Sequence, residues 1–471
     1  MTRMHAGGPV GHVPDRPTRS TLGGVSSLVP STQVLVDFAG DGEGTDELSW
    51  GQWEIWQAMV DQQTSLPIGG TAPRADDSVD DVAEELRYLM SRYQTMRTRI
   101  VYSDDGRPLQ SVSAKGQIVL EVFEAGEQDP VQLAKRVHHE YATKPFDLVN
   151  EWPMRMAAIC KRGKPVQLVA VSSHLTTDGT GGMVMIDEVA RRVEEPVDGM
   201  QPLEQARWQR SPAGVRQNRA ALRYFARQLD QIPLGMLEDA SGAGAGPESR
   251  YWKGKLRSEA LSLAVRVLTA RTEVDSSAIM IALYATGFAH ATGQRVFFTR
   301  PVVSNRFRTR LSNVVCMLAQ AGICVIEVAG CTVDEVITKA QRAAMSAYKH
   351  AYFHPQQLSA LIAETAARRG PSFSASCFFN DRNTTSRADL AGGLPDPAEI
   401  AHARSRTSFG WVPGPHQICD RLFLNVEDVP GLIELTVDFD THHVSPQTVE
   451  AMLRAMEEAA VDAASDPDHR V

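Results

Sequence analysis

Residues 166–193 read VQLVAVSSHLTTDGTGGMVMIDEVARRV, and this stretch decides the fold. Val166 to Ser173 is a short apolar run rich in valine, which is typical of a buried strand. His174 to Gly179 is a polar segment that turns the chain. Beyond it, apolar residues recur at helical spacing, so a strand, a turn and a helix are predicted in direct succession; the apolar positions are Met183, Ile186, Val189 and Val193.

The turn carries the candidate chemistry. His174 ends the strand, Asp178 follows four residues later, and Gly179 stands just before the helix. In a chain with 13 histidines, average Asp and Gly usage predicts about 0.05 chance matches to His-x-x-x-Asp-Gly. The motif alone leaves an alternative open, a core histidine at a strand end beside a helix-capping aspartate. Because side chains alternate along a strand, His174 shares a face with Leu168, and Ser173 points the other way. If the Leu168 face looks into a cleft, His174 reaches it.

Length and composition set the limits. A chain of 471 residues, 43% hydrophobic and 22% charged, fits a soluble globular protein of two domains that contain both helices and strands. No apolar run reaches about 18 residues, which excludes a membrane-spanning helix. Residues 1–31 lack the apolar segment of a signal peptide and are expected to form a flexible tail. Six cysteines without a CxxC spacing indicate a reducing, cytoplasmic compartment.

Charge and ligand spacing exclude two classes of function. The net charge of −9 argues against nucleic acid as a partner. The pairs His138-His139 and His442-His443 do not offer the three or four convergent ligands of a zinc site, so no metal is expected.

One stretch departs from the acidic average, with six arginines on or beside a predicted helix. They fit a solvated helix face, or alternatively a docking patch for an acidic protein or a phosphate-bearing arm. The six are Arg207, Arg210, Arg216, Arg219, Arg223 and Arg227.

Four segments in the right order resemble the condensation domains of nonribosomal peptide synthetases, over nearly the whole chain from Leu48 on. Leu48 to Trp56, with Ser49 as the expected helix N-cap, is similar to the opening Ser-x-x-Gln-x-x-x-Trp helix. Arg92 to Ile100 is similar to Arg-His-x-x-Leu-Arg-Thr-x-Phe, with Tyr93 in place of the histidine. Phe146 to Arg155 is similar to the Phe-Asp-Leu to Pro-x-x-Arg stretch. Ser173 to Gly179 is similar to His-His-x-x-x-Asp-Gly, with Ser173 in place of the first histidine.

The resemblance implies an α+β fold of two chloramphenicol-acetyltransferase-like lobes. They would form a V-shaped pseudo-dimer with a central tunnel and His174 near its middle. The expected division is a tail over residues 1–31, an N-terminal lobe over 32–195 and a C-terminal lobe over 196–471. The C-terminal lobe would include a crossover segment after Pro301 to Arg306.

The resemblance also assigns roles to the residues of the site. His174 is the expected catalytic residue, and the backbone N–H at or near Gly179 is expected to stabilise an oxyanion. Asp178 is expected to be structural and to pair with Arg155. Ser173 is a motif variant near the site.

The implied activity is that of a free-standing condensation-type acyltransferase in natural-product biosynthesis. It would join an acyl or aminoacyl thioester, carried on the phosphopantetheine arm of a carrier protein, to an amine or alcohol, as a monomer without a cofactor of its own. The alternative is a catalytically reduced relative that binds a carrier protein and recruits a partner enzyme. Heterocyclising and epimerising relatives carry motifs that are absent here and are disfavoured.

Overall fold

The computed structural model describes residues 28–238, 250–382, 393–412, 414 and 420–471, and most of the predicted tail lies outside these ranges. Its last part does not: the Leu28 N–H donates to Glu140, and the Ser31 N–H donates to the Val122 carbonyl. These two bonds attach residues 28 and 31 to the body of the protein ahead of the strand that begins at Thr32, and the division of the chain into a tail over residues 1–31 stays a prediction.

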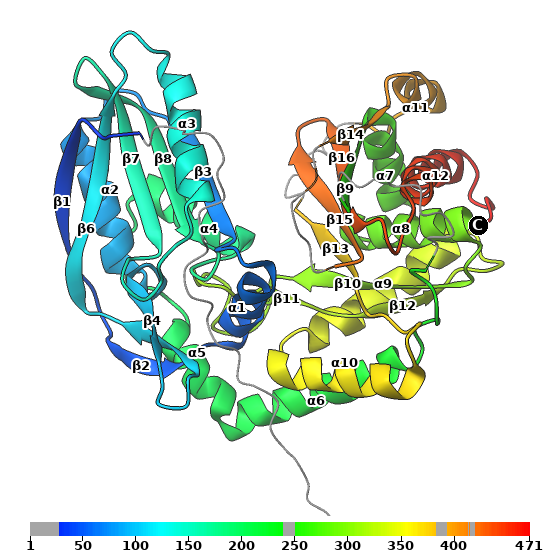
Figure 1. Ribbon diagram of the computed structural model, residues 1–471. Coiled ribbons are helices and arrows are strands. Elements are labelled where there is room, and N and C mark those ends of the chain that lie inside the picture. The colour runs from blue at the N-terminus through cyan, green and yellow to red at the C-terminus, as the bar shows by residue number, and fades with distance from the viewer. Residues whose placement is uncertain (1–27, 239–249, 383–392, 413, 415–419) are drawn as a thin grey trace, which may run out of the picture.

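The first half of the chain forms one lobe around a five-stranded sheet, at the left of Figure 1. The strand order is β1-β6-β7-β8-β3, and a three-stranded sheet, β2-β5-β4, lies beside it. The strands are β1 (Thr32–Ala39), β2 (Gly44–Glu47), β3 (Pro67–Pro73), β4 (Thr98–Tyr102), β5 (Pro108–Val112), β6 (Lys115–Glu124), β7 (Met154–Lys161) and β8 (Lys164–Ser173). The helices are α1 (Trp50–Gln62), α2 (Val79–Arg92), the 3-10 helix η1 (Gln94–Arg97), α3 (Pro130–Thr143) and α4 (Gly179–Arg191).

Helices cover both faces of the five-stranded sheet. Leu168 lies on the face that packs against α2 and α4, in a core that includes Leu86 and Val189. Val169 and Val171 lie on the other face, in a core with residues of α3. The Leu168 face therefore forms a helix-packed core, so the condition that it looks into a cleft is not met at Leu168.

The second half of the chain forms the other lobe around an eight-stranded sheet. The order is β11-β10-β13-β15-β16-β9-β14, with β12 also on β10, and β13 pairs in parallel with both β10 and β15. The strands are β9 (Tyr251–Ser258), β10 (Val296–Val303), β11 (Gln320–Ala321), β12 (Cys324–Glu327), β13 (Cys377–Asp381), β14 (Ser408–Val412), β15 (Leu422–Val429) and β16 (Leu432–Asp440). The helices are α5 (Pro202–Arg210), α6 (Pro212–Leu229), α7 (Glu259–Thr272), α8 (Ser276–Thr292), α9 (Val333–His350), α10 (Pro355–Arg369), α11 (Pro397–Arg404) and α12 (Pro446–Ser465).

The two faces of this second sheet differ in polarity. Alternate residues such as Leu435 and Val437 join the core under α7, α8 and α12. Their neighbours on the other face are polar, for example Thr436, which donates to Glu427 over 2.8 Å. Figure 1 shows this face turned toward the first lobe, so the ribbons form a V. Because side chains alternate along each strand, one face of the sheet is apolar and covered by helices, and the other face is polar and turned toward the first lobe.

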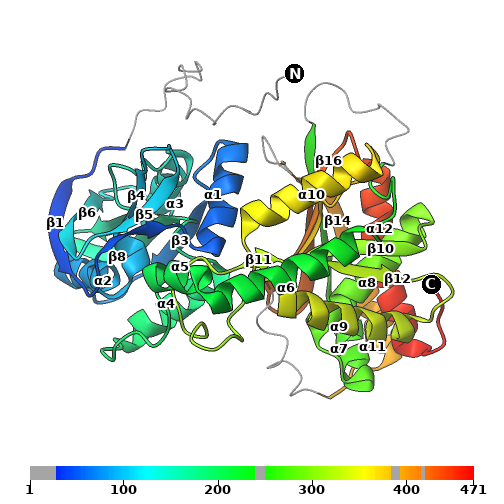
Figure 2. The same cartoon turned by 90° about the horizontal axis from the view of Figure 1, so that it is seen from below.

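Two segments connect the lobes. Helix α6 runs along the underside, as Figure 2 shows. The chain after β10 crosses to the first lobe, where Val315 packs in the core of α2 and α4, before β11 returns it. This matches the crossover expected after Pro301 to Arg306. The exact division at residues 195 and 196 stays a prediction, and α5 packs on both β2 and α6.

Among the helices that the structure describes, none combines the length and apolarity needed to cross a bilayer.

Candidate active site

His174 is positioned by the end of β8. The strand pairs with β7 and β3, and the chain leaves it at Ser173. The His174 N–H donates to the Leu66 carbonyl over 3.1 Å, and the Thr176 N–H donates to the Ser173 carbonyl over 3.0 Å. The hydroxyl of Thr95, in η1, donates to the Thr176 carbonyl. These bonds fix the backbone of the turn and therefore the position from which the His174 side chain extends.

The imidazole of His174 is half-buried and is set up to be neutral. Burial lowers its pKa from the ordinary 6.5. The charge of Asp178 and the backbone of His174 and Thr177 act in the opposite direction, and Arg382 on the other lobe lowers the pKa further. Its Nδ1 atom is buried and has no hydrogen-bond partner within the described part of the chain. A neutral imidazole is able to take up a proton near pH 7.

Asp178 is buried and saturated with donors. It is the N-cap of α4, and its Oδ1 accepts from the Gly181 N–H over 2.8 Å. Its carboxylate also pairs with Arg306 over 2.8 Å and accepts from the N–H groups of Leu318 and Ala319 over 3.0 and 2.9 Å. Asp178 therefore joins the turn to the crossover segment, as a structural residue does, and has no oxygen left for a substrate.

Arg155 does not pair with Asp178, so that prediction is wrong. It lies on β7 opposite Val171, whose face is covered by α3. There its guanidinium donates to the carbonyls of Tyr141, Lys144 and Pro145 and to Glu151, at 2.6–2.9 Å. Arg155 thus holds the segment after α3. The pairing role belongs to Arg306, the arginine of the segment that begins at Pro301.

Ser173 points away from His174. It is fully buried, and its hydroxyl accepts from the Leu175 N–H over 3.3 Å. Its own N–H donates to the Pro153 carbonyl. The residue that replaces the first motif histidine therefore belongs to the core of the turn.

Two glycines at the start of α4 have different reasons to be glycine. A Cβ on Gly181 would lie 2.3 Å from Thr177 Oγ1 and 2.7 Å from Arg306 Nη2, so packing demands glycine there. A Cβ on Gly179 would meet nothing within 4 Å, and the residue is exposed. The first N–H groups of a helix lack intrahelical partners and carry partial positive charge. The N-terminus of α4 therefore presents donors beside open space, five residues after His174.

A second motif region holds α4 from the other side. Tyr93, which stands where the related motif has histidine, donates through its hydroxyl to Glu188 of α4 over 2.5 Å. Arg92 bonds the same carboxylate over 2.7 Å. Sequence reasoning did not identify these contacts as part of the site, nor did it identify Arg306 and Arg382. The indication that the sequence did offer was that Tyr93 and Arg306 stand in segments resembling the family's motifs.

Within the described residues, no group of three or more His, Cys, Asp or Glu side chains converges as metal ligands would.

The comparisons with known proteins agree with this geometry. The sequence model of the family described as Condensation domain matches residues 74–471. Tyrocidine synthase 3 of Brevibacillus parabrevis is 24% identical over 386 residues, which are 79% of this chain and 6% of that protein. Surfactin synthase subunit 2 of Bacillus subtilis (strain 168) is 23% identical over 238 residues, 48% of this chain and 6% of that protein. The chain thus spans 6% of the length of each of these two relatives.

Solved structures share the fold. SgcC5 from Streptomyces globisporus aligns with a TM-score of 0.65 at 18% identity, over 90% of this chain and 100% of that one. The condensation domain of the Monacolin K polyketide synthase MokA aligns with a TM-score of 0.69 at 15% identity, over 91% and 100%. The X-domain from teicoplanin biosynthesis, in its complex with OxyB, aligns with a TM-score of 0.65 at 18% identity, over 92% and 96%.

The expected fold of two chloramphenicol-acetyltransferase-like lobes is confirmed by these structures, and the match of the family's sequence model over most of the chain identifies this protein as a member of the condensation-domain family.

Proposed function

We propose that the chain is a condensation-type acyltransferase that joins a carrier-bound acyl or aminoacyl thioester to an amine or alcohol. The observation that carries the proposal is the position of His174, in a turn held by Asp178 that leads directly into the open N-terminus of α4, with burial lowering the pKa of the imidazole.

The reaction moves one proton in two transfers, and we assign both to His174. The acceptor's nitrogen or oxygen attacks the thioester carbonyl carbon, and a C–N or C–O bond forms. The acceptor's proton passes to the imidazole, the C–S bond breaks, and the same proton is returned to the thiolate sulfur. Because burial keeps the imidazole neutral, it is ready to accept the proton. A positioned base of this kind contributes typically 10²–10⁴-fold to the rate.

The tetrahedral intermediate carries a negative oxygen that requires donors. The N–H groups at the start of α4, at or near Gly179, supply them, and the partial positive charge of the helix N-terminus adds to the effect. Gly179 leaves the approach open because it has no side chain. His174 and this N-terminus together form the proposed catalytic pair.

The donor substrate is proposed from the relatives. Those that match in sequence are synthases and synthetases by name, one of them a nonribosomal peptide synthetase, and the chain corresponds to a small part of each. We therefore assign the acyl thioester to the phosphopantetheine arm of a carrier protein, which makes that carrier the partner and leaves the chain without a cofactor of its own.

A second candidate function is recruitment without catalysis. It is favoured by the similarity to the X-domain, which has been solved in complex with OxyB, and by the departure from the motif at position 173. The burial of Ser173 weighs against it, because that substitution lies in the core and leaves His174 untouched.

The test is thioester release followed by mass spectrometry. Acyl thioesters are offered both as free pantetheine conjugates and loaded on carrier proteins, with a pool of amines and alcohols. We expect an adduct and free thiol from the wild type and from His139→Ala, an exposed histidine on α3, and a loss of about 10²-fold or more from His174→Ala. Turnover of His174→Ala at the wild-type rate would refute the assignment. Equal capture of a carrier by wild type and His174→Ala, with no product from either, would establish the recruiting function instead.

A further inference from the structure

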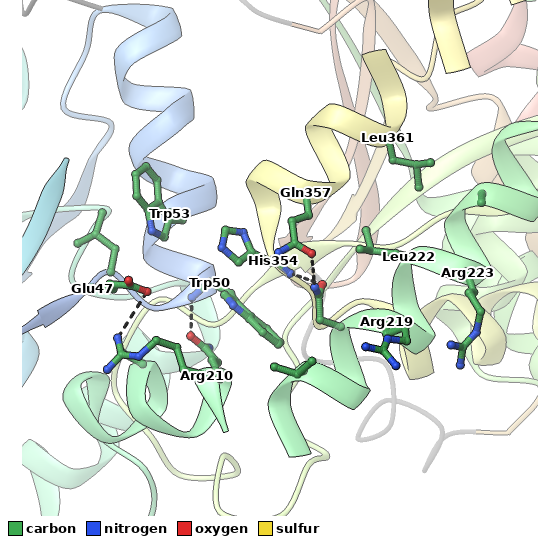
Figure 3. A pocket seen from close by; sticks show the side chains of 16 residues that line it. Glu47, Trp50, Trp53, Arg210, Arg219, Leu222, Arg223, His354, Gln357 and Leu361 are labelled. Carbon is green, nitrogen blue, oxygen red and sulfur yellow. Dashed lines mark hydrogen bonds and ion pairs between the residues drawn. The ribbon is translucent and has the colours of Figure 1, made fainter. Parts of the chain in front are cut away.

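A cavity of about 610 Å³ lies apart from His174, where helices from both halves of the chain meet. Figure 3 shows α1 on one side of it, α10 on the other and α5 and α6 below. None of its lining residues belongs to the turn that holds His174. They include Trp50, Trp53, Arg219, Leu222, Arg223 and Leu361.

One part of the lining is apolar and aromatic. Trp50 is held rigidly, with its ring 5.0 Å from that of Tyr352 in an edge contact and its backbone N–H bonded to Gln209. Trp53 is half-buried one turn further along α1. Leu222 and Leu361 line the cavity from α6 and α10. These side chains favour a flat apolar group, for which indole faces supply area and stacking.

The other part of the lining carries uncompensated positive charge. Glu47 is the one acidic side chain among the lining residues, and Arg210 neutralises it over 3.5 Å. Arg219 and Arg223 stand one turn apart on α6, both exposed, and across the described residues neither has an ion pair or hydrogen bond. Two free guanidinium groups at the edge of a cavity attract an anion, and their planar donors match a carboxylate.

The polar floor between these parts is already organised. The Asn218 amide donates to Gln357 over 2.7 Å and accepts from the His354 N–H over 2.8 Å. These bonds fix α10 on α6, so the cavity is formed before any ligand enters. Its volume falls within the range of about 300–1,000 Å³ that is typical of small-molecule sites.

We propose that this cavity is a second ligand site, which takes an amphipathic organic anion: a flat aromatic body with one carboxylate. The aromatic body lies against Trp53, the accessible indole of the two since Trp50 is only 5% exposed, and the carboxylate meets Arg219 and Arg223. Such a ligand touches α1, α6 and α10 at once. The proposal does not depend on the reaction at His174.

The test is isothermal titration calorimetry of the full chain with three probes of one shape. They are 2-naphthylacetate, the neutral 2-(2-naphthyl)ethanol and the cationic 2-(2-naphthyl)ethylamine. We expect saturable binding of 2-naphthylacetate at one site per chain, tighter than that of the other two. The double variant Arg219→Ala/Arg223→Ala removes two exposed charge contacts and should weaken binding of the anion about tenfold, without affecting the alcohol. Trp53→Ala should weaken both.

The matched control is Arg216→Ala/Arg227→Ala, which removes two exposed arginines of α6 that do not line this cavity. It should leave the affinity for 2-naphthylacetate unchanged and so separates a local site from the general charge of the helix. The proposal is overturned if the anion shows no saturable binding up to about 1 mM. It is equally overturned if the alcohol binds as tightly as the anion, or if the Arg219/Arg223 variant keeps the wild-type affinity.

Discussion

The pairing of Asp178 with Arg306 is open to a direct thermodynamic test with the variant Asp178→Asn. The asparagine keeps an oxygen for the Gly181 N–H, so the helix cap survives. The other carboxylate oxygen accepts from Arg306 and from the N–H groups of Leu318 and Ala319. In the variant, an NH₂ group faces these three donors and the charge that balances Arg306 is gone.

The expected cost is set by burial. Asp178 and Arg306 are only 4% and 7% exposed. Removing one partner of a buried ion pair costs about 3–5 kcal/mol, because the other charge stays buried without compensation. Arg306→Gln should cost about 3 kcal/mol for the same reason. The double variant no longer holds an unpaired charge, so we expect it to be less destabilised than the sum of the singles by about 2–3 kcal/mol.

Arg155→Gln is the matched control. Its carbonyl and Glu151 contacts belong to the segment after α3, and it shares none of the partners of Asp178. It should destabilise the protein, but its effect should add to that of Asp178→Asn within about 0.5 kcal/mol.

The assay is urea unfolding followed by both circular dichroism and tryptophan fluorescence, for the three single variants and the two double variants, Asp178/Arg306 and Asp178/Arg155, beside the wild type. A coupling between Asp178 and Arg306 below about 0.5 kcal/mol would refute the reasoning. A coupling of Asp178 with Arg155 that is larger than its coupling with Arg306 would refute it as well.

Three further predictions concern the same site. Because burial lowers the pKa of His174 below 6.5, the acid limb of kcat/KM should have its midpoint below pH 6.5. The stability that the neutral imidazole contributes should be present above pH 6.5 and be lost as the pH falls through the lowered pKa of His174. An acid limb of kcat/KM with its midpoint above pH 7 would contradict the lowered pKa. Tyr93→Phe removes the hydroxyl bond to Glu188 and should lower the free energy of unfolding by about 1–2 kcal/mol in urea titrations, since Glu188 loses one of two donors. Gly179→Ala should keep the wild-type melting temperature but slow turnover about tenfold or more, whereas Gly181→Ala should lower the melting temperature, because only the second position lacks room for a Cβ; equal melting temperatures for the two variants would contradict the packing argument.

Local features of the site follow from the sequence because they depend on neighbours in the chain. The strand to Ser173 and the helix from Gly179 are as the hydrophobic periods predict. Ser49 and Asp178 are N-caps, as residue preference indicates.

Contacts between distant segments do not follow from spacing. Asp178 and Arg306 are 128 residues apart, and both Arg155 and Arg306 stand in motif segments. The choice between them depends on which side of β7 faces α3 and on where the crossover passes, which are properties of the packed lobes. The Leu168 face illustrates the same limit. A period of two identifies an apolar face, but it does not tell a cleft from a face covered by helices.

The two departures from the family's motifs, Ser173 and Tyr93, stand within motif segments but do not disrupt the site. Ser173 lies in the core of the turn, so the loss of a histidine there removes no group that reaches a substrate. Tyr93 is longer than a histidine, and its hydroxyl bonds Glu188 and so holds α4 in place. The groups that position His174 and the N-terminus of α4 are Asp178, Arg306, Thr95 and Glu188, and all of them make their contacts. The buried ion pair of Asp178 and Arg306 stabilises the fold under either function, because its removal costs several kcal/mol. The choice between the acyltransferase and the recruiting function therefore rests on His174 and the N-terminus of α4, and the thioester assay with His174→Ala decides it.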